Sequence, residues 1–186
     1  QGVGLNNATS AVQTQIGGWV QANGNLAGNS ARVILNEVNA SSPSQLRGFV
    51  EVAGQRAEVV IANPAGIAVN GGGFINASTV TLTTGTPILN SGNLEGYRVT
   101  GGNIQIEGAG LDVSGATYAQ VLARAVQLNT GLWAQQVKVV TGAHQANADA
   151  SVISPIAPDA GSTPTYSLDV AALGGMYAGK ITLIGT

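Results

Sequence analysis

Short segments in which apolar and polar residues alternate dominate the chain. Within residues 104–107 two isoleucines alternate with Gln105 and Glu107, and within residues 136–140 valines flank Lys138. A period of two places one side chain in a core and the next in solvent, so the pattern predicts half-buried β-strands. We expect strands at residues 31–35, 48–52, 58–61, 79–83, 103–107, 111–113, 125–128, 136–140 and 180–184.

Glycine and asparagine separate these segments, and they predict turns at residues 70–71, 101–103, 108–110 and 129–131. Many short strands with close turns suit either a β-sandwich or a parallel β-helix. Aromatic residues make up only 4% of the chain, which is few for a sandwich core. A β-helix stacks narrow coils of roughly 20 residues, whose interior needs only Val, Ile, Leu and Ala. The pattern therefore favours an all-β parallel β-helix, although no exact repeat is visible.

Two segments depart from the strand pattern. Residues 117–125 are compatible with a short helical turn or with a strand, and their periodicity does not decide between them. Residues 143–165 have lost the apolar rhythm and contain Pro155, Pro158 and Pro164, which predicts a loop outside the helix body. The strand pattern resumes at residues 166–170.

Composition excludes several classes of protein. Charged residues make up 9% and hydrophobic residues 44%, a balance opposite to that of disordered chains. The net charge is −2 and the seven Lys and Arg are scattered, so we expect no nucleic-acid partner. No apolar stretch reaches the ~20 residues of a membrane-spanning helix, so we expect no integral membrane protein. The absence of cysteine suits a chain that crosses an oxidising periplasm unfolded.

The most distinctive turn is Asn63-Pro64-Ala65-Gly66-Ile67, which follows the apolar run at residues 59–61. A residue before proline is driven out of the helical region, and glycine tolerates a positive φ. The segment therefore predicts a sharp corner between two buried strands. A glycine-rich stretch and a threonine-rich strand, residues 79–84, come next.

This region resembles the TPS domain, the secretion domain at the N-terminus of large two-partner-secreted exoproteins. Filamentous haemagglutinins and CdiA-type contact-dependent growth inhibition effectors carry such domains. Similar segments follow one another in the same order at residues 5–8, 45–54, 73–76, 81–87 and 172–181. Two features depart from the family pattern: Ala65 replaces a common asparagine, and residues 70–73 lack the cysteine pair of many growth-inhibition members.

The resemblance implies a single domain over residues 1–186 that folds as a right-handed parallel β-helix with extra-helical loops or a hairpin. It also leads us to expect an N-terminal cap upstream of Gln1, in a longer protein. Its expected partner is an outer-membrane transporter of the TpsB/CdiB type, whose periplasmic POTRA domains bind the chain. The domain would then cross the periplasm, reach the cell surface and fold there as a monomer. Asn63, Pro64, Gly66 and Ile67 would contact the transporter, shape the corner, or do both.

Two other functions remain open, an adhesive β-solenoid that binds glycans and a β-helical polysaccharide-active enzyme. An enzyme of the second kind needs clustered carboxylates. The candidate acids are far apart in sequence: Asp112, Asp149, Asp159 and Asp169. We therefore expect no catalytic residues, and we expect no cofactor.

The single histidine and the large aromatic residues add no further candidate chemistry. His144 is the only histidine, and without a partner at metal-ligand spacing we expect a solvent-exposed loop residue and no metal site. The larger aromatic residues are expected in the core or in a cap: Trp19, Trp133, Phe49 and Phe74.

Overall fold

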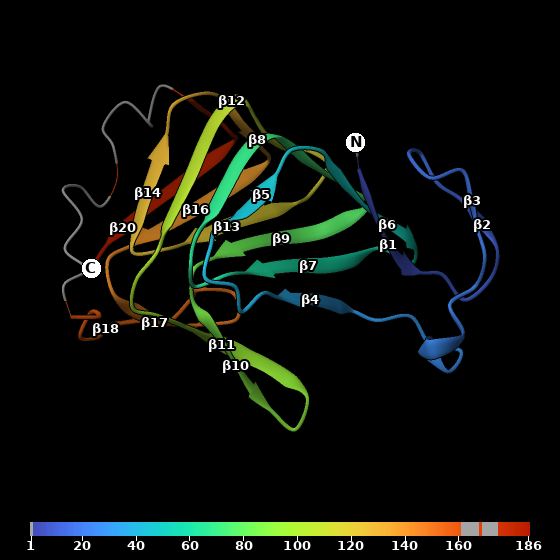
Figure 1. The fold of residues 1–186 in the computed structure, drawn as a ribbon, viewed down its shortest axis with the longest axis horizontal. Coiled ribbons are helices and arrows are strands. Elements are labelled where there is room, and N and C mark those ends of the chain that lie inside the picture. The colour runs from blue at the N-terminus through green and yellow to red at the C-terminus, as the bar shows by residue number, and fades with distance from the viewer. Residues whose placement is uncertain (1, 161–167, 169–174) are drawn as a thin grey trace.

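A computed structural model describes residues 2–160, 168 and 175–186. Parallel strands from successive coils lie side by side and form three faces around one apolar interior (Figure 1). The first face contains β5 (Ser44–Leu46), the N-terminal halves of β8 (Ile67–Ile75) and β12 (Asn103–Val113), and β14 (Ala125–Leu128). The second contains β1 (Val3–Asn7), β6 (Phe49–Gly54), the C-terminal halves of β8 and β12, β15 (Leu132–Ala134) and β19 (Met176–Tyr177). The third contains β4 (Val33–Glu37), β7 (Ala57–Ala62), β9 (Ala77–Thr83), β13 (Tyr118–Leu122), β16 (Gln136–Thr141) and β20 (Lys180–Gly185).

These strands confirm the elements predicted from alternation and settle the ambiguous segment at 117–125, which contains strand β13. Two of the predicted turns are wrong. Residues 70–71 lie inside β8 and residues 108–110 lie inside β12, so the chain does not reverse its direction at either place. Gly71, Gly108 and Gly110 have φ of 76°, 59° and 81°, values that glycine adopts freely. Each long strand can therefore bend from the first face to the second without ending.

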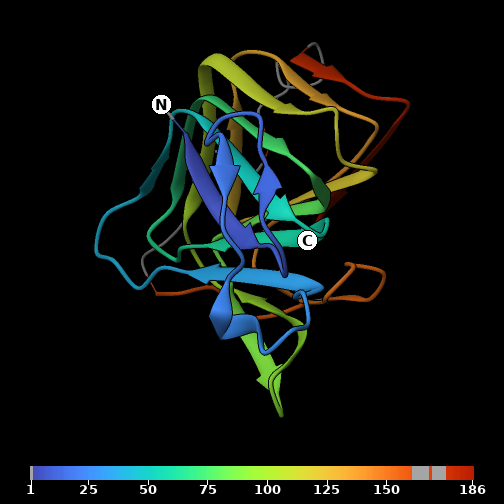
Figure 2. The same ribbon diagram turned by 90° about the vertical axis from the view of Figure 1, so that its right-hand side faces the viewer.

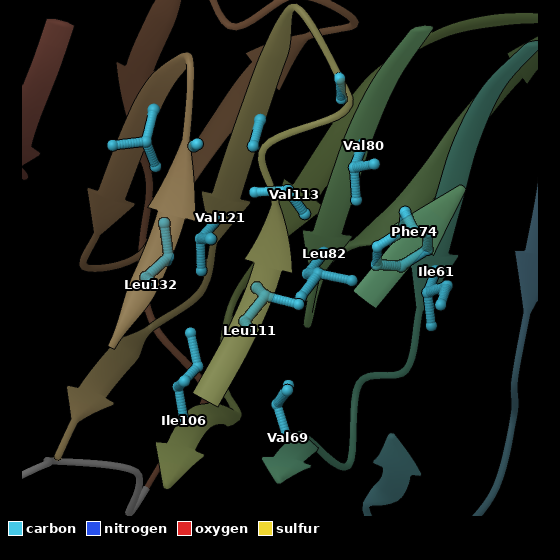
Figure 3. Close-up of a cluster of buried hydrophobic side chains, with 14 of the residues drawn as sticks. Ile61, Val69, Phe74, Val80, Leu82, Ile106, Leu111, Val113, Val121 and Leu132 are labelled. Carbon is cyan, nitrogen blue, oxygen red and sulfur yellow. The ribbon is translucent and has the colours of Figure 1, made fainter. Parts of the chain in front are cut away.

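Inward side chains stack in columns because the strands pair in register. On the third face, Ile61 pairs with Leu82, Leu82 with Val121, and Val121 with Val139. Leu111 and Val113 of the second face point toward this column across the interior (Figure 3). Burial of apolar surface is worth about 25 cal/mol per Å². Each coil thus stabilises the coil before it.

Two excursions leave the coils and form a separate antiparallel sheet, here called the outer sheet. The first is the hairpin β10 (Thr86–Asn90) and β11 (Asn93–Val99), and the second carries β17 (His144–Asn147) and β18 (Ile153–Pro155). The strand order is β10-β11-β17-β18. Thus part of the segment predicted as an extra-helical loop consists of strands outside the coils. Residues 161–165, and residues 166–170 apart from Leu168, lie outside the described residues.

The outer sheet covers the solvent side of the third face. Val60, Leu122 and Val140 of the coils pack there with Tyr97 and Val99 in a second hydrophobic core. The third face is therefore apolar on both sides, which explains why its strands carry apolar residues at positions that alternation alone assigns to solvent.

The hairpin of β2 (Val12–Gln13) and β3 (Trp19–Val20) lies between β1 and β4 in the chain, followed by the 3₁₀ helix η1 (Gly24–Leu26). Figure 2 shows it in front of the coils, next to β1. The buried carboxylate of Glu51 accepts hydrogen bonds from the backbone N–H groups of Gln15 and Ile16, at 2.8–2.9 Å. Trp19, expected in a core or cap, is 69% exposed at the hairpin end. Within the described part of the chain, no helix is long and apolar enough to cross a membrane.

His144 is fully buried, contrary to the expectation of an exposed loop histidine. It opens β17, and its Nδ1 lies 2.8 Å from the carbonyl oxygen of Gly142. Because a carbonyl can only accept, Nδ1 carries the proton and Nε2 is the unprotonated nitrogen. Nε2 is buried without a hydrogen-bond partner. Burial lowers the pKa of His144, since a charged ring would lose its hydration.

We expect stability to fall as the pH drops below the ordinary histidine pKa of about 6.5. The folded pKa lies below that value, so the unfolded chain binds the proton first and the contribution of neutral His144 is lost on acidification. Urea unfolding between about pH 7.5 and about pH 5.5 should show a loss of up to about 1.4 kcal/mol per pH unit. In the His144→Gln variant this slope should flatten. An equal slope in both proteins would contradict the assignment, because the chain has no other histidine.

Candidate functional site

The predicted corner lies between β7 on the third face and β8 on the first. The Gly66 N–H donates to the Asn63 carbonyl at 3.0 Å, which closes the turn. The Gly66 carbonyl accepts from the Ser44 N–H at 3.0 Å, and the Asn63 N–H donates to the Thr83 carbonyl at 3.0 Å. Ser44 belongs to the preceding strand of the first face and Thr83 ends the next strand of the third. The corner is therefore bonded to the coils on both sides of it.

The side chain of Asn63 is completely buried and makes three hydrogen bonds. Its Nδ2 donates to the Ser42 carbonyl at 3.1 Å and to the Ser44 hydroxyl at 2.9 Å. Its Oδ1 accepts from the Ala65 N–H at 3.0 Å. Both amide hydrogens are used, so the amide holds the turn and the preceding coil together.

The other predicted site residues divide into buried and accessible ones. Gly66 has φ of 120°, and a Cβ there would lie 2.8 Å from the Asn103 carbonyl oxygen. Ile67 is 1% exposed and belongs to the core. Pro64 is exposed. Among the four candidates, only Pro64 presents its side chain to solvent in the folded domain.

Two further asparagines, Asn7 and Asn76, hold corners in the same way, and the sequence alone predicted no role for them. Asn7 is 1% exposed; its Nδ2 donates to the carbonyls of Ala31 and Gln55, and its Oδ1 accepts from the Ala31 N–H. The Nδ2 of Asn76 donates to the carbonyls of Val52 and Gly54, at 2.8 Å each. Asn7 ends β1 and Asn76 follows β8, so both stand where the second face ends. Both asparagines lie in segments that resemble the TPS family, residues 5–8 and 73–76, and this resemblance could have identified them.

Exposed aromatic side chains form a column on the outer side of the second face. Strand pairing aligns Phe49, Gly73, Asp112, Trp133 and Tyr177 across successive coils. The rings of Phe49, Trp133 and Tyr177 are exposed. The expectation that Phe49 and Trp133 lie in a core or cap is therefore wrong, whereas Phe74 is buried as expected. The rings of Trp133 and Tyr177 stack at 5.9 Å with an interplanar angle of 11°.

Two of these aromatic side chains, Phe49 and Trp133, border a shallow groove. Phe49 and Trp133 line a hollow of about 580 Å³ together with Asp112 and Ser114. Gly71, Gly72 and Ala109 complete its lining. The Asp112 carboxylate is held by Ser114, whose N–H and hydroxyl both donate to Oδ1. We call this hollow the aromatic groove.

The candidate acids do not gather into one site. Asp112 lies in the aromatic groove, whereas Asp149 lines a different hollow under the outer sheet. Asp159 accepts a hydrogen bond from the Thr100 hydroxyl at 3.1 Å. Asp169 is outside the described residues. Where the structure describes the chain, no three His, Cys, Asp or Glu side chains come together as metal ligands.

Comparison with known proteins agrees with this geometry. The family described as the TPS secretion domain matches residues 4–186. The chain belongs to this family. The crystal structure of a filamentous hemagglutinin secretion domain superposes with a TM-score of 0.90 and 37% identity, over 100% of this chain and 66% of that one. The match confirms the predicted right-handed parallel β-helix with its extra-helical hairpin.

Curated relatives of this TPS domain are large toxins. The domain is 53% identical to Toxin CdiA of Yersinia pestis, 46% to tRNA nuclease CdiA-2 of Burkholderia pseudomallei and 47% to 16S rRNA endonuclease CdiA of Enterobacter cloacae. Each alignment covers 100% of this chain but 6% of the relative. The chain therefore spans about 6% of the length of these relatives.

Asn63→Ala should destabilise the TPS domain, because it removes a buried amide that makes three hydrogen bonds. At about 1 kcal/mol per bond, the free energy of unfolding should fall by about 3 kcal/mol. Pro64→Ala is the matched control, since an exposed side chain should change stability by less than about 0.5 kcal/mol if the turn is kept. Urea unfolding of the two variants measures both values. Similar values for the two variants would show that the corner does not depend on the amide.

Proposed function

We propose that this TPS domain is the secretion signal of its exoprotein, recognised in the periplasm by the POTRA domains of a TpsB/CdiB-type outer-membrane transporter. After passage to the cell surface it folds into the β-helix described above. The observation that supports this proposal most directly is the corner at residues 63–66, which is bonded to the coil before it and to the coil that follows. Such a corner is completed only as successive coils arrive.

Folding at the surface supplies a physical bias for export. The periplasm holds no ATP, so the chain needs another source of free energy for directed movement. A β-helix grows by addition, because each coil contacts only its neighbours. Each coil that emerges buries apolar side chains on the coil outside it, at about 25 cal/mol per Å². A folded coil cannot return through the transporter.

Burial restricts when the transporter can meet Asn63. In the folded domain both amide hydrogens are bonded and the side chain has no exposed surface. The transporter therefore contacts the amide in the unfolded chain, before the corner closes. Pro64 is accessible in both states, so it is the residue of this motif that a partner can touch after folding. Recognition and corner formation then use the same asparagine at successive stages.

The domain itself is proposed to be non-catalytic. Three relatives are called toxins or nucleases, but the chain spans 6% of their length, and the described acids lie apart. We propose a contact-dependent growth inhibition effector as the parent protein, with its toxic activity in another part of the chain. Its place in the cell is the bacterial surface or the medium.

A second candidate function, adhesion, is favoured by the aromatic groove. Stacked, exposed rings beside a fixed carboxylate can hold a sugar ring by apolar contact while Asp112 accepts hydrogen bonds from hydroxyl groups. Glycan binding at this groove is compatible with export, since it takes place after folding.

Export is tested with a reporter fused after Thr186, preceded by the N-terminal cap and signal peptide and expressed with the cognate transporter. Asn63→Ala should reduce secretion of the reporter. Because this variant also loses stability, Thr83→Val serves as the matched control. It removes a buried hydroxyl that bonds the Leu122 carbonyl and the Gly85 N–H, both at 2.8 Å, and keeps the Thr83 carbonyl that accepts from the Asn63 N–H. If both variants are exported equally at equal stability, Asn63 acts only as a corner residue. Unchanged export of Asn63→Ala and Pro64→Ala would refute recognition through this motif.

Adhesion predicts that Trp133→Ala weakens binding of the folded domain to arrayed neutral glycans by tenfold or more, a loss of about 1.4 kcal/mol. Trp19→Ala, which removes an exposed ring of the β2–β3 hairpin that does not line the groove, should leave binding unchanged. Equal losses in both variants, or no glycan binding by the unmodified domain, would exclude the groove as a sugar site.

A further inference from the structure

A small polar cavity lies between the third face and the outer sheet. Its volume is about 130 Å³, room for roughly four water molecules at ~30 Å³ each. Oxygen-bearing side chains from both sides line it, together with Leu94 and Ala148: Glu58, Thr79, Thr81, Tyr118, Gln120, Tyr97 and Asp149. The first five project from β7, β9 and β13 of the coils, and Asp149 comes from the turn between β17 and β18.

Gln120 presents an unpartnered oxygen to this cavity. The residue is 2% exposed, and its Nε2 donates to the Thr81 hydroxyl at 2.9 Å and to the Ala148 carbonyl at 2.7 Å. Because the Ala148 carbonyl can only accept, the amide orientation is determined and Oε1 is the remaining end. Oε1 is buried and has no hydrogen-bond partner in the protein. A buried polar atom left in this way costs about 1–3 kcal/mol, so it points to a bound group that satisfies it.

A second buried oxygen shares this condition. The hydroxyl of Tyr118 also has no partner in the protein. Burial raises its pKa, and the Asp149 carboxylate raises it further, so the hydroxyl remains neutral. Burial likewise raises the pKa of Tyr97, on the outer-sheet side, to about 12. The two tyrosines therefore add no negative charge of their own.

The charge of the cavity is set by the two carboxylates, Glu58 and Asp149. Both side chains are exposed, so they lie at its open side. The nearby ammonium group of Lys138 donates to the Ala150 carbonyl at 3.0 Å. Apart from the Gln120 Nε2 group, whose hydrogens are bonded to Thr81 and Ala148, the polar side-chain atoms that line the cavity are oxygens, and two of the side chains are carboxylates.

We propose that this cavity binds a calcium ion that joins the coils to the outer sheet. Calcium takes six to eight oxygen ligands from carboxylates, amide carbonyls and water, in a flexible geometry. Glu58 and Asp149 supply charge, Gln120 Oε1 and Tyr118 Oη supply neutral oxygens, and water completes the shell. With two carboxylates, the dissociation constant falls in the range of extracellular calcium modules, about 10⁻⁴–10⁻³ M.

The ion would act on folding. The coil ligands and Asp149 come from segments far apart in the sequence, so the site exists only when the outer sheet is docked. A ligand that binds only the folded state multiplies the folding equilibrium constant by 1 + [L]/Kd, an elevenfold gain at about ten times Kd. Calcium outside the cell would thus favour the folded domain where folding is required.

The test is a pair of measurements on the 186-residue chain. Terbium replaces calcium and emits light when a nearby tyrosine absorbs, so bound terbium should be sensitised by Tyr118 and displaced by calcium. Tyr118→Phe should reduce this emission by half or more while terbium still binds. In parallel, calcium at about ten times Kd should raise the Tm by several degrees.

Three variants with different expected effects keep the test decisive. The double variant Glu58→Gln, Asp149→Asn should lose the calcium-dependent Tm shift and weaken terbium binding at least tenfold. Glu107→Gln, which removes a carboxylate on the first face, should retain both. Thr79→Asp adds a third carboxylate and should tighten binding at least threefold.

The proposal fails if calcium does not change the Tm of the unmodified domain, which would mean that the cavity holds water only. It also fails if the double variant and Glu107→Gln respond equally, because binding would then reflect general surface charge. Loss of folding in the double variant is detected by its circular dichroism without calcium, and in that case Thr79→Asp decides the outcome.

Discussion

In-register stacking of apolar side chains between successive coils is the interaction on which the rest of this TPS domain depends. Columns such as Ile61, Leu82, Val121 and Val139 form because parallel strands pair residue by residue. A shift by one residue would turn every apolar side chain outward, so burial and register enforce each other. This pairing fixes which residues end each strand. It therefore also fixes where the corners, the aromatic groove and the outer-sheet strands lie.

Buried asparagines complete the stack at its corners. A corner interrupts the strand ladder and leaves backbone carbonyls and N–H groups without strand partners. The amides of Asn7, Asn63 and Asn76 satisfy these groups on their own and neighbouring coils. One side chain with two donors and an acceptor can do this within a narrow coil, where a charged group would carry a desolvation penalty. In the folded domain the Asn-Pro motif thus connects its own turn to the preceding coil. The proposed recognition by the transporter takes place before these hydrogen bonds form.

The outer sheet adds a second layer of apolar packing on the third face. It buries the solvent side of the third face and encloses His144, Tyr97 and the polar cavity. Apolar packing therefore places ionisable groups in surroundings they would not meet on an exposed coil. The proposed calcium site, the neutral histidine and the raised tyrosine pKa values all arise from this one docking contact.

Local patterns were sufficient for much of the fold and for the corner. Alternation in residues 104–107 and 136–140 reflects the pleat of a strand, a property of consecutive residues. The Asn63-Pro64 dipeptide and Gly66 restrict φ and ψ locally, so the turn could be predicted from them. The low content of aromatic residues favoured the narrow coils of a β-helix. The corner and the similar segments around it, such as residues 45–54 and 81–87, identified the family.

By itself, then, the sequence determined the strands, the β-helix and the corner at residues 63–66. Only the tertiary structure decided that His144 is buried and Trp133 exposed, that Gly108 to Gly110 bend a strand without ending it, and that Asn63 bonds Ser42 and Ser44. The physical reason is that these features depend on which coil lies next to which. That adjacency is set by non-local register and by the excursions between coils, and neither leaves a signal in neighbouring residues.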